Sequence, residues 1–293
     1  MTAQAKPAIE VRNLRIGYTA KGAQREIFPA FSAAAGEAEL VALLGRNGRG
    51  KSTLLRTIIG IQPPLDGAVH ILEKDIRSYP LRTLATLVSY VSTDNVKVGN
   101  LKVFDLVSLG RYPYTGWFGA LSAGDKKVVM QSLEMVGMEA YAWQNTGCLS
   151  DGERQRVVIA RALAQDTPII VLDEPTAFLD LPNRYEIVLL LKQLAQEQRR
   201  AILFSTHDLS IALKIADRVW VMCDGEFHQG APQKLMLDNV FDKLLQNTRL
   251  SVDHETGEVR VELEKGVPKN KAFRRNHPPQ PEGSTLQSYP PAQ

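Results

Sequence analysis

Residues 41–53 of this 293-residue chain read VALLGRNGRGKST, and this stretch decides the fold. The apolar run VALL is typical of a buried strand, a glycine-rich loop follows it directly, and the next residues, LLRTIIG, have helix-like periodicity. Residues 45–52 fit the spacing G-x-x-x-x-G-K-[ST] in the strand–loop–helix context that a phosphate-binding P-loop requires. The stretch therefore predicts an α/β fold with a phosphate site at the end of a buried strand.

The residue types of this loop suit the phosphates of a nucleotide together with Mg²⁺. Glycines allow backbone N–H groups to turn inward around phosphates, and the helix that begins near Lys51 adds a positive dipole. We expect Lys51 to reach the β and γ phosphates as a catalytic residue, and the Ser52 hydroxyl to ligate Mg²⁺. The alternative is a glycine-rich turn that binds nothing, but a lysine, a hydroxyl and two glycines fall in register here. The nucleotide-binding residues predicted in the loop are Gly45, Arg46, Asn47, Gly48, Arg49, Gly50, Lys51, Ser52 and Thr53.

A second apolar run, residues 169–172, ends in two carboxylates, Asp173 and Glu174. Asp173 suits holding Mg²⁺ through water, and Glu174 can polarise the attacking water as a general base. Two acids after a strand usually form a solvated turn, but in a chain with a P-loop they indicate nucleotide hydrolysis. His207 follows the run AILFST and is a third polar group at the carboxyl edge of a strand, where ligands of open α/β sheets gather. We predict a catalytic role for His207; a structural or exposed histidine is the alternative.

Short apolar runs rich in Val, Ile and Leu indicate further buried strands, and most lead through loop residues into helix-like periodicity. This alternation favours an α/β core around a mainly parallel sheet. The runs are residues 40–44, 169–172, 201–204 and 219–222. Residues 8–16 and 26–34 are predicted as strands of an N-terminal antiparallel β flap, whereas helix-like patterns at 103–109 and 126–136 predict an inserted α-helical subdomain.

The predicted domain organisation follows from these patterns. The sequence VDHETGEVRVELE after residue 250 indicates a hairpin that turns at Thr256-Gly257. Six of the 16 prolines lie beyond residue 267, where we expect little packed structure. The predicted parts are an ATP-binding core at 1–93 and 151–250, an inserted helical subdomain at 94–150, a β-hairpin at 251–267 and a disordered, proline-rich basic tail at 268–293.

Composition excludes several classes of protein. The chain has 35 Lys plus Arg against 32 Asp plus Glu, but the tail holds four of the basic residues and one acidic residue. The remaining 31 basic and 31 acidic residues lack the broad basic footprint of a nucleic-acid binder. No apolar run approaches the roughly 20 residues that a membrane-spanning helix needs, and no secretory signal is visible. With two cysteines, Cys148 and Cys223, a disulfide framework is ruled out and a reducing cytosol is expected.

Residues 149–156, LSDGERQR, lie shortly before the second apolar run and resemble the signature motif of ATP-binding-cassette (ABC) ATPases. The resemblance extends over about residues 8–250, and the motifs occur in the family's order. It implies a RecA-like P-loop NTPase core of ABC type, in which residues 45–53 are the Walker A loop and Asp173 with Glu174 ends the Walker B strand. The further roles that it implies are adenine stacking by Tyr18, a D-loop at 177–180 in which Asp180 contacts nucleotide, and a switch histidine at His207.

In this family two cassettes pair head to tail, so the resemblance implies that Ser150 and Gly152 bind ATP held by the P-loop of a second copy. Ser150-x-x-Glu153 before an apolar periodic run is also a helix capping box. The two readings are compatible, because the N–H groups that need a cap can bind a phosphate when the dimer closes.

The sequence GRYPY at 110–114, followed by WFG at 117–119, is similar to the ATPases of iron–siderophore, haem and cobalamin importers. An aromatic cluster of local core is the alternative. The narrower resemblance implies a homodimer bound to integral membrane permease subunits through about residues 93–114, and indirectly to a solute-binding protein, at the cytoplasmic face of the inner membrane. The alternative function is a soluble ABC ATPase of Fe–S cluster assembly or DNA maintenance. DNA-maintenance cassettes separate their halves by long coiled coils, and no sustained heptads occur here.

Two departures from the family pattern stand out. Thr93 replaces the glutamine that reaches Mg²⁺, and we predict weaker metal ligation there without loss of hydrolysis, with Asp94 and Asn95 as open alternatives. The second departure is a set of added charges. Arg46 and Arg49 in the phosphate loop could pair with Asp151 or Glu153 of a second copy, or Arg154 and Arg156 could screen these acids locally.

Overall fold

A six-stranded sheet lies at the centre of the described part of the chain, in the order β10-β9-β3-β8-β7-β6. The computed structural model describes residues 6–20, 22–93, 101–116, 119–246, 248–253 and 257–261. The strands are β3 (Leu40–Gly45), β6 (Val88–Val91), β7 (Ile169–Leu172), β8 (Ala201–Thr206), β9 (Arg218–Cys223) and β10 (Glu226–Gly230). All neighbours pair in parallel except β9 and β10, which are antiparallel. The predicted parallel α/β core is therefore confirmed.

Strand β3 is buried on both faces, and its alternating side chains enter two different cores. Val41 and Leu43 pack with the N-terminal strands and α1 (Lys51–Ile58), whereas Leu40, Ala42 and Leu44 pack with the helical part of the chain. Such burial on both faces explains the uninterrupted apolar run that predicted a strand here. It also fixes the glycine-rich loop after Gly45 at the carboxyl edge of the sheet.

The N-terminal flap is an antiparallel sheet in the order β2-β1-β4-β5. Its strands are β1 (Pro7–Ala20), β2 (Ala23–Gly36), β4 (Asp66–Ile71) and β5 (Lys74–Asp75). The predicted strands at 8–16 and 26–34 lie within β1 and β2, but the hairpin extends further on both sides of its turn. Strand β4 was not predicted from the sequence, because Asp66, Gly67 and His70 interrupt its apolar pattern.

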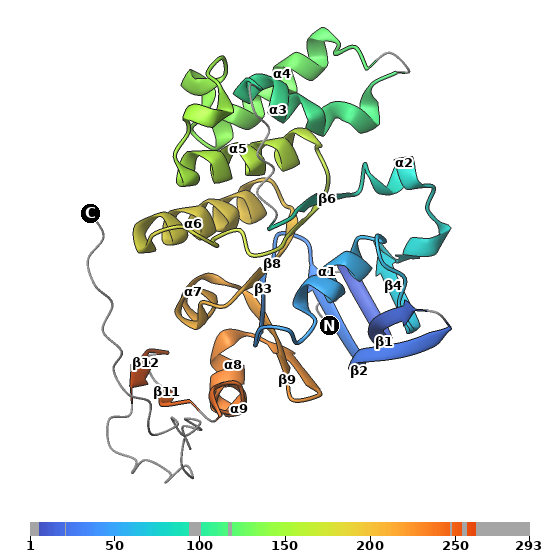
Figure 1. Cartoon of the computed structure of the whole chain (residues 1–293), viewed down its shortest axis with the longest axis vertical. Coiled ribbons are helices and arrows are strands. Elements are labelled where there is room, and N and C mark those ends of the chain that lie inside the picture. The colour runs from blue at the N-terminus through green and yellow to red at the C-terminus, as the bar shows by residue number, and fades with distance from the viewer. Residues whose placement is uncertain are drawn as a thin grey trace, which may run out of the picture. The chain divides into compact units, whose positions relative to one another are not determined.

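The inserted region is helical and lies at the β6 end of the sheet, above α5 in Figure 1. Its described elements are α3 (Val103–Ser108), the 3-10 segment η2 (Leu109–Tyr114), α4 (Ala123–Met135) and the short 3-10 segments η3 (Glu139–Tyr141) and η4 (Thr146–Cys148), and α5 (Asp151–Ala164) follows. The Arg111 guanidinium binds the Asp125 carboxylate at 2.9 Å and donates to the Ala164 carbonyl at 2.8 Å. Tyr114 donates to the Gln165 carbonyl at 2.9 Å. Part of the GRYPY sequence thus fastens η2 to α4 and to the end of α5, while Trp117 and Phe118 lie outside the described residues.

The remaining α-helices and strands of the described residues lie outside the inserted region, and Figure 1 shows α8 and α9 beside β9. They are α2 (Leu81–Leu84), α6 (Leu181–Glu197), α7 (Leu209–Ile215), α8 (Pro232–Leu237), α9 (Val240–Leu245), β11 (Leu250–Val252) and β12 (Val259–Val261). Strands β11 and β12 pair antiparallel, and Gly257 between them has the left-handed φ of 70°. Thr256 and the tail at 268–293 lie outside the described residues. Among the helices described, none is both long and apolar enough to span a bilayer.

Candidate nucleotide-binding site

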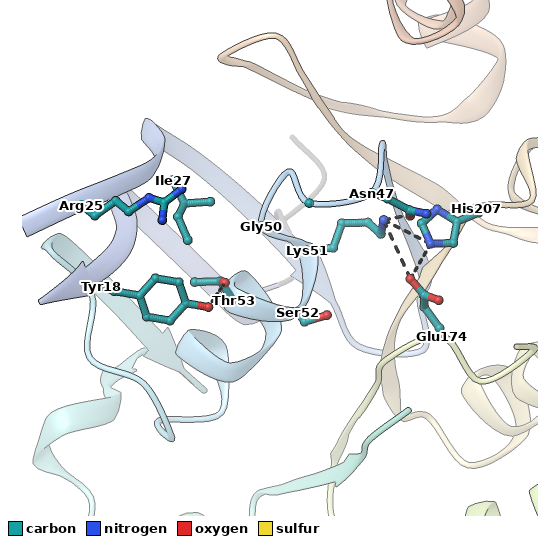
Figure 2. Close-up of a pocket in the computed structure, with 11 residues that line it drawn as sticks. Tyr18, Arg25, Ile27, Asn47, Gly50, Lys51, Ser52, Thr53, Glu174 and His207 are labelled. Carbon is teal, nitrogen blue, oxygen red and sulfur yellow. Dashed lines mark hydrogen bonds and ion pairs between the residues drawn. The ribbon is translucent and has the colours of Figure 1, made fainter. Parts of the chain in front are cut away.

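A cavity of about 530 Å³ opens at the carboxyl end of β3, and Figure 2 shows the side chains that surround it. Three segments supply one side: the β1–β2 hairpin, the glycine-rich loop and the start of α1. The loops after β7 and β8 supply the other side. The lining residues are Tyr18, Arg25, Ile27, Asn47, Gly48, Gly50, Lys51, Ser52, Thr53, Glu174 and His207. The structure therefore brings together the predicted phosphate loop, Glu174 and His207, which are distant in the sequence.

The phosphate loop depends on two glycines with left-handed backbone. Gly48 has φ 75° and Gly50 has φ 98°, a region that costs other residues energy. A Cβ on Gly50 would lie 2.6 Å from Cγ2 of Ile27, so the position also lacks room for a side chain. No side chain caps α1, which begins at Lys51. Its first N–H groups are therefore available to an anion at the helix N-terminus.

Lys51 is buried, and its ammonium group is held between both sides of the cavity. Nζ donates to the Gly45 carbonyl at 2.8 Å, lies 3.3 Å from Nδ1 of His207 and 3.9 Å from Oε1 of Glu174. Figure 2 shows these three side chains pointing toward one another. Burial lowers the pKa of Lys51, while the charges of Glu174 and Asp173 raise it in opposition. A phosphate beside Nζ would add further negative charge to that of Glu174 and would stabilise the charged form of this buried lysine.

The two acids after β7 have different surroundings. The Asp173 side chain is almost inaccessible, at 3% exposure, and its Oδ1 accepts a 2.7 Å hydrogen bond from the Ser205 hydroxyl on β8. The same hydroxyl accepts from the Glu174 N–H at 2.8 Å, where the backbone has a left-handed φ of 50°. This turn directs the Glu174 carboxylate into the cavity, where it contacts Nε2 of His207 at 2.5 Å. Asp173 is thus fixed by the sheet, and Glu174 faces the reaction space.

Tyr18 lies at the opposite end of the cavity from Glu174. Its hydroxyl is 2.9 Å from Oγ1 of Thr53, and 45% of the residue is exposed. The ring is therefore anchored at its tip with accessible surface for a stacked base. Arg25 is the cross-strand partner of Tyr18 on β2 and also lines the cavity.

Thr93, the predicted metal ligand that replaces glutamine, lies beside the end of β7. Its hydroxyl donates to the backbone carbonyl of Asp173 at 3.1 Å, and Thr93 does not line the cavity. This hydrogen bond joins the loop after β6 to the end of β7. Asp94 and Asn95, the two alternatives, lie outside the described residues.

Ser150, Gly152 and Asp180, all predicted to bind nucleotide, lie together but away from the cavity. The capping box is present: the Ser150 hydroxyl accepts from the Glu153 N–H, and the Glu153 carboxylate accepts from the Ser150 N–H at 2.8 Å. The N–H and the hydroxyl of Ser150 both donate to the Glu153 carboxylate, and these two hydrogen bonds lower the pKa of Glu153. The Asn183 amide, bound to the Asp180 carboxylate at 2.7 Å, lies against Gly152. A role of this cluster in binding nucleotide therefore requires a second copy.

The added charges of the loop and of the signature have partners in their own chain. Arg154 binds Asp151 at 2.9 Å, which favours local screening, whereas Arg156 binds Glu186 on α6. Among the described residues, Arg46 and Arg49 are absent from the cavity lining. Their guanidinium groups lie against C-terminal elements of the same chain.

Sequence reasoning missed three residues of the site. Arg25 and Ile27 carry no motif and reach the cavity only through the register of the β1–β2 hairpin. Ser205 lies in the apolar run before His207, and its inward position follows from the pairing of β7 with β8. The sequence offered one signal for Ser205. Side chains alternate between the two faces of a strand, which places Ser205 on the same face of β8 as Leu203.

Comparison with known proteins agrees with this geometry. Residues 30–177 match the family model described as ABC transporter. The achromobactin transport ATP-binding protein CbrD of Dickeya dadantii is 36% identical over 247 residues, which cover 84% of this chain and 88% of the relative. The iron(3+)-hydroxamate import ATP-binding protein FhuC of Bacillus subtilis is 34% identical over 240 residues, covering 82% and 88%.

A solved structure adds a nucleotide-bound example. It is a dimeric ATP-binding cassette in a post-hydrolysis state with ADP and Pi, at 28% identity, and it aligns with a TM-score of 0.66 over 76% of this chain and 98% of the other. The P-loop, the acids after β7 and His207 thus occur in a chain whose sequence and whose fold both match ATP-binding cassettes. The chain belongs to the ABC transporter family and is one of its ATP-binding, ATP-hydrolysing subunits.

Proposed function

We propose that this chain is the ATPase of an importer for a metal chelate such as an iron–siderophore complex, haem or a cobalamin-like compound. The observation that carries the proposal is the convergence of Lys51, Glu174 and His207 on one cavity. The names of the relatives supply the substrate class, because the compared proteins serve achromobactin transport and iron(3+)-hydroxamate import.

Hydrolysis would proceed by in-line attack of water on the γ-phosphate, mainly through positioning and charge stabilisation. Glu174 acts as the general base that orients and polarises the water, since its carboxylate faces the cavity. Lys51 stabilises the β and γ phosphates, and His207 contacts the γ-phosphate from the end of β8. The backbone N–H groups of residues 45–53 bind the remaining phosphate oxygens.

The donor set of the site fits Mg²⁺. The inaccessible Asp173 carboxylate and the Ser52 hydroxyl are hard oxygen ligands, and the Asp173 carboxylate accepts a hydrogen bond from Ser205. No group of three or more His, Cys, Asp or Glu capable of holding a metal occurs among the described residues. This agrees with an ion that completes its shell with phosphate oxygens and water. Asp173 and Ser52 would hold Mg²⁺, which would supply positive charge to neutralise the phosphates.

The position of the signature residues supports a head-to-tail homodimer. Ser150 and Gly152 lie at the N-terminus of α5, away from the cavity of their own chain. They would bind the nucleotide of the second copy, with Asp180 at the same interface. Each closed dimer would then hold two molecules of MgATP.

A groove of about 780 Å³ between α2 and η2 suits a short helix of the permease. Leu81 and Tyr112, exposed by 83% and 77%, lie beside it. Arg82 donates to the carbonyls of Pro113 and Thr115, both at 3.0 Å, which fixes the two walls together. Permease binding here would place the subunit at the cytoplasmic face of the membrane, with a solute-binding protein acting on the far side.

The experiment is reconstitution of the chain with candidate permease subunits of metal-chelate importers from the same organism. We expect co-purification, and ATP hydrolysis that is sensitive to vanadate and stimulated by one loaded solute-binding protein. A Tyr112→Ala, Leu81→Ala variant should lose co-purification yet keep ATP binding, and Leu189→Ala, an exposed leucine on α6, is the matched control. ATP hydrolysis without any membrane partner, together with co-purification of a soluble scaffold, would overturn the importer assignment.

A further inference from the structure

Two arginines of the phosphate loop bind the C-terminal part of the same chain. Nε of Arg46 donates to the Leu244 carbonyl at 3.0 Å, and Nη2 of Arg46 donates to the Gln246 carbonyl. Nη2 of Arg49 binds Oδ1 of Asp224 at 3.0 Å, in the turn between β9 and β10. The outer side of the loop is therefore attached at three points to segments that follow it by 175 to 200 residues.

We propose that Arg46 is a positioning residue for ATP binding, assisted by Arg49, and that it orders the phosphate loop by tethering it to the end of α9. The proposal rests on ATP binding at this loop. Neither arginine lines the cavity. Their role is to hold Gly48 and Gly50 in the left-handed conformations that turn the loop around the phosphates.

The two tethers differ in strength. Arg46 is partly buried and binds two carbonyls at the C-terminal end of a helix, where the helix dipole favours a cation. Its planar fork reaches both acceptors at once, which a lysine cannot do. The Arg49–Asp224 pair is about half exposed on both sides, at 48% and 52%, and exposed pairs contribute little. Arg46 is therefore the main tether.

A tether of this kind acts on ATP affinity rather than on the chemical step. A glycine-rich loop loses much conformational freedom when it closes around phosphates. A loop that is already ordered loses less on binding, so the affinity is higher. The coupling is reciprocal: ATP bound in the loop must in turn stabilise the segment 240–246.

The test uses the full-length chain with Arg46→Ala, Arg46→Lys and Arg46→Gln, and Arg56→Ala as the control. Arg56 is an exposed cation on α1, so its removal reports the general effect of lost positive charge. For Arg46→Ala we expect the Kd and KM for ATP to rise by about fivefold or more, with kcat within about twofold. Arg46→Lys should recover only part of the affinity, and Arg56→Ala should leave both constants near those of the parent.

Hydrogen exchange of residues 240–246 separates a tether from a general loss of stability. In the parent, saturating ATP should slow exchange in this segment, and in Arg46→Ala at saturating ATP the slowing should disappear while α1 stays protected. Two results would overturn the proposal. One is a fall in kcat at unchanged KM in Arg46→Ala, and the other is hydrogen exchange at 240–246 that does not change when ATP is added to the parent.

A trans pairing is tested in the same series. If Asp151→Arg restored the ATP affinity lost in Arg49→Asp, Arg49 would pair with Asp151 of a second copy. That result would overturn the tether for Arg49. Failure of the tether leaves ATP hydrolysis by the parent intact, whereas a parent that does not bind ATP at all would refute the ATPase function itself.

Discussion

The Ser205 hydroxyl joins the two acids of the site, donating to the Asp173 carboxylate at 2.7 Å and accepting from the Glu174 N–H at 2.8 Å. One buried side chain on β8 thus fixes both the residue proposed to hold Mg²⁺ and the backbone turn that directs the general base. Partners of this kind orient metal-binding carboxylates and strongly affect activity.

Ser205→Ala should lower ATP hydrolysis by about 10- to 100-fold and raise the Mg²⁺ concentration needed for half-maximal rate. The free energy of unfolding should fall by about 1–2 kcal/mol, because a buried hydrogen-bonding group is lost. Phosphate release against Mg²⁺ concentration measures the first effect, and denaturant unfolding measures the second. Ser210→Ala on α7 is the matched control, and equal losses in both variants would contradict the role of Ser205.

Glu174→Gln should reduce the hydrolysis rate by about 100-fold or more while ATP binding is retained. Glutamine keeps the size of the side chain and can still bind His207, but it cannot accept a proton from water. Single-turnover hydrolysis and equilibrium binding of ATP together distinguish the two effects. Glu186→Gln, which removes the exposed partner of Arg156, should keep near-parent rates. A Glu174→Gln protein with half the parent rate would exclude Glu174 as the base.

Binding of ATP should weaken as the pH rises through the alkaline range below 10.5, because burial lowers the pKa of Lys51 from that value. In this range free Lys51 is partly neutral, whereas the ATP polyanion favours the charged form, so binding takes up a proton. The folding stability of the nucleotide-free protein has the opposite pH dependence. In this pH range Lys51 binds more protons in the unfolded chain than in the folded one, so its contribution to the free energy of unfolding rises with pH.

Calorimetry of ATP binding in two buffers of different ionisation enthalpy measures this proton uptake. Lys51→Arg keeps its charge throughout the range and should show none of it. Identical proton uptake by the parent and by Lys51→Arg would assign the titration to another group.

Thr93→Val should weaken the attachment of the loop after β6, because it removes the hydroxyl that binds the Asp173 carbonyl and keeps the shape. We expect a loss of about 0.5–1.5 kcal/mol in unfolding free energy and a moderate fall in ATPase activity. Thr93→Ser should restore both. If Thr93→Ala abolished activity as fully as Glu174→Gln, Thr93 would instead be an essential part of the site.

The fold and the centre of the site were predictable because their signals are local. Residues 45–53 carry strand, loop and helix in one stretch, and β3 and β7 are buried on both faces, which makes their runs continuously apolar. The chemistry of Lys51 and Glu174 follows from their place at the ends of these strands. Strand β4 was not predicted, because its polar residues interrupt the apolar pattern of a strand that is buried on one face only.

The partners of Arg46 and Thr93 could not be predicted, since both bind backbone carbonyls of distant segments. A carbonyl occurs at every position, so residue types give no sign of which one accepts. Ser205 is a similar case: its link to Asp173 depends on the pairing of β7 with β8. Contacts that depend on strand register or on distant segments can be identified only from the folded structure.

The position of β3 between β8 and β9 also has a consequence for synthesis on the ribosome. Both neighbours of this strand are made late, and Lys51 precedes His207 by 156 positions. At about 5–20 residues per second, roughly 10–30 s separate the two residues at the peptidyl-transferase centre. Over that interval the nascent chain contains the complete phosphate-loop sequence, but β3 has no neighbouring strand on either edge. Such a chain needs protection from aggregation, and it gains ATPase activity only when its last core strands have emerged.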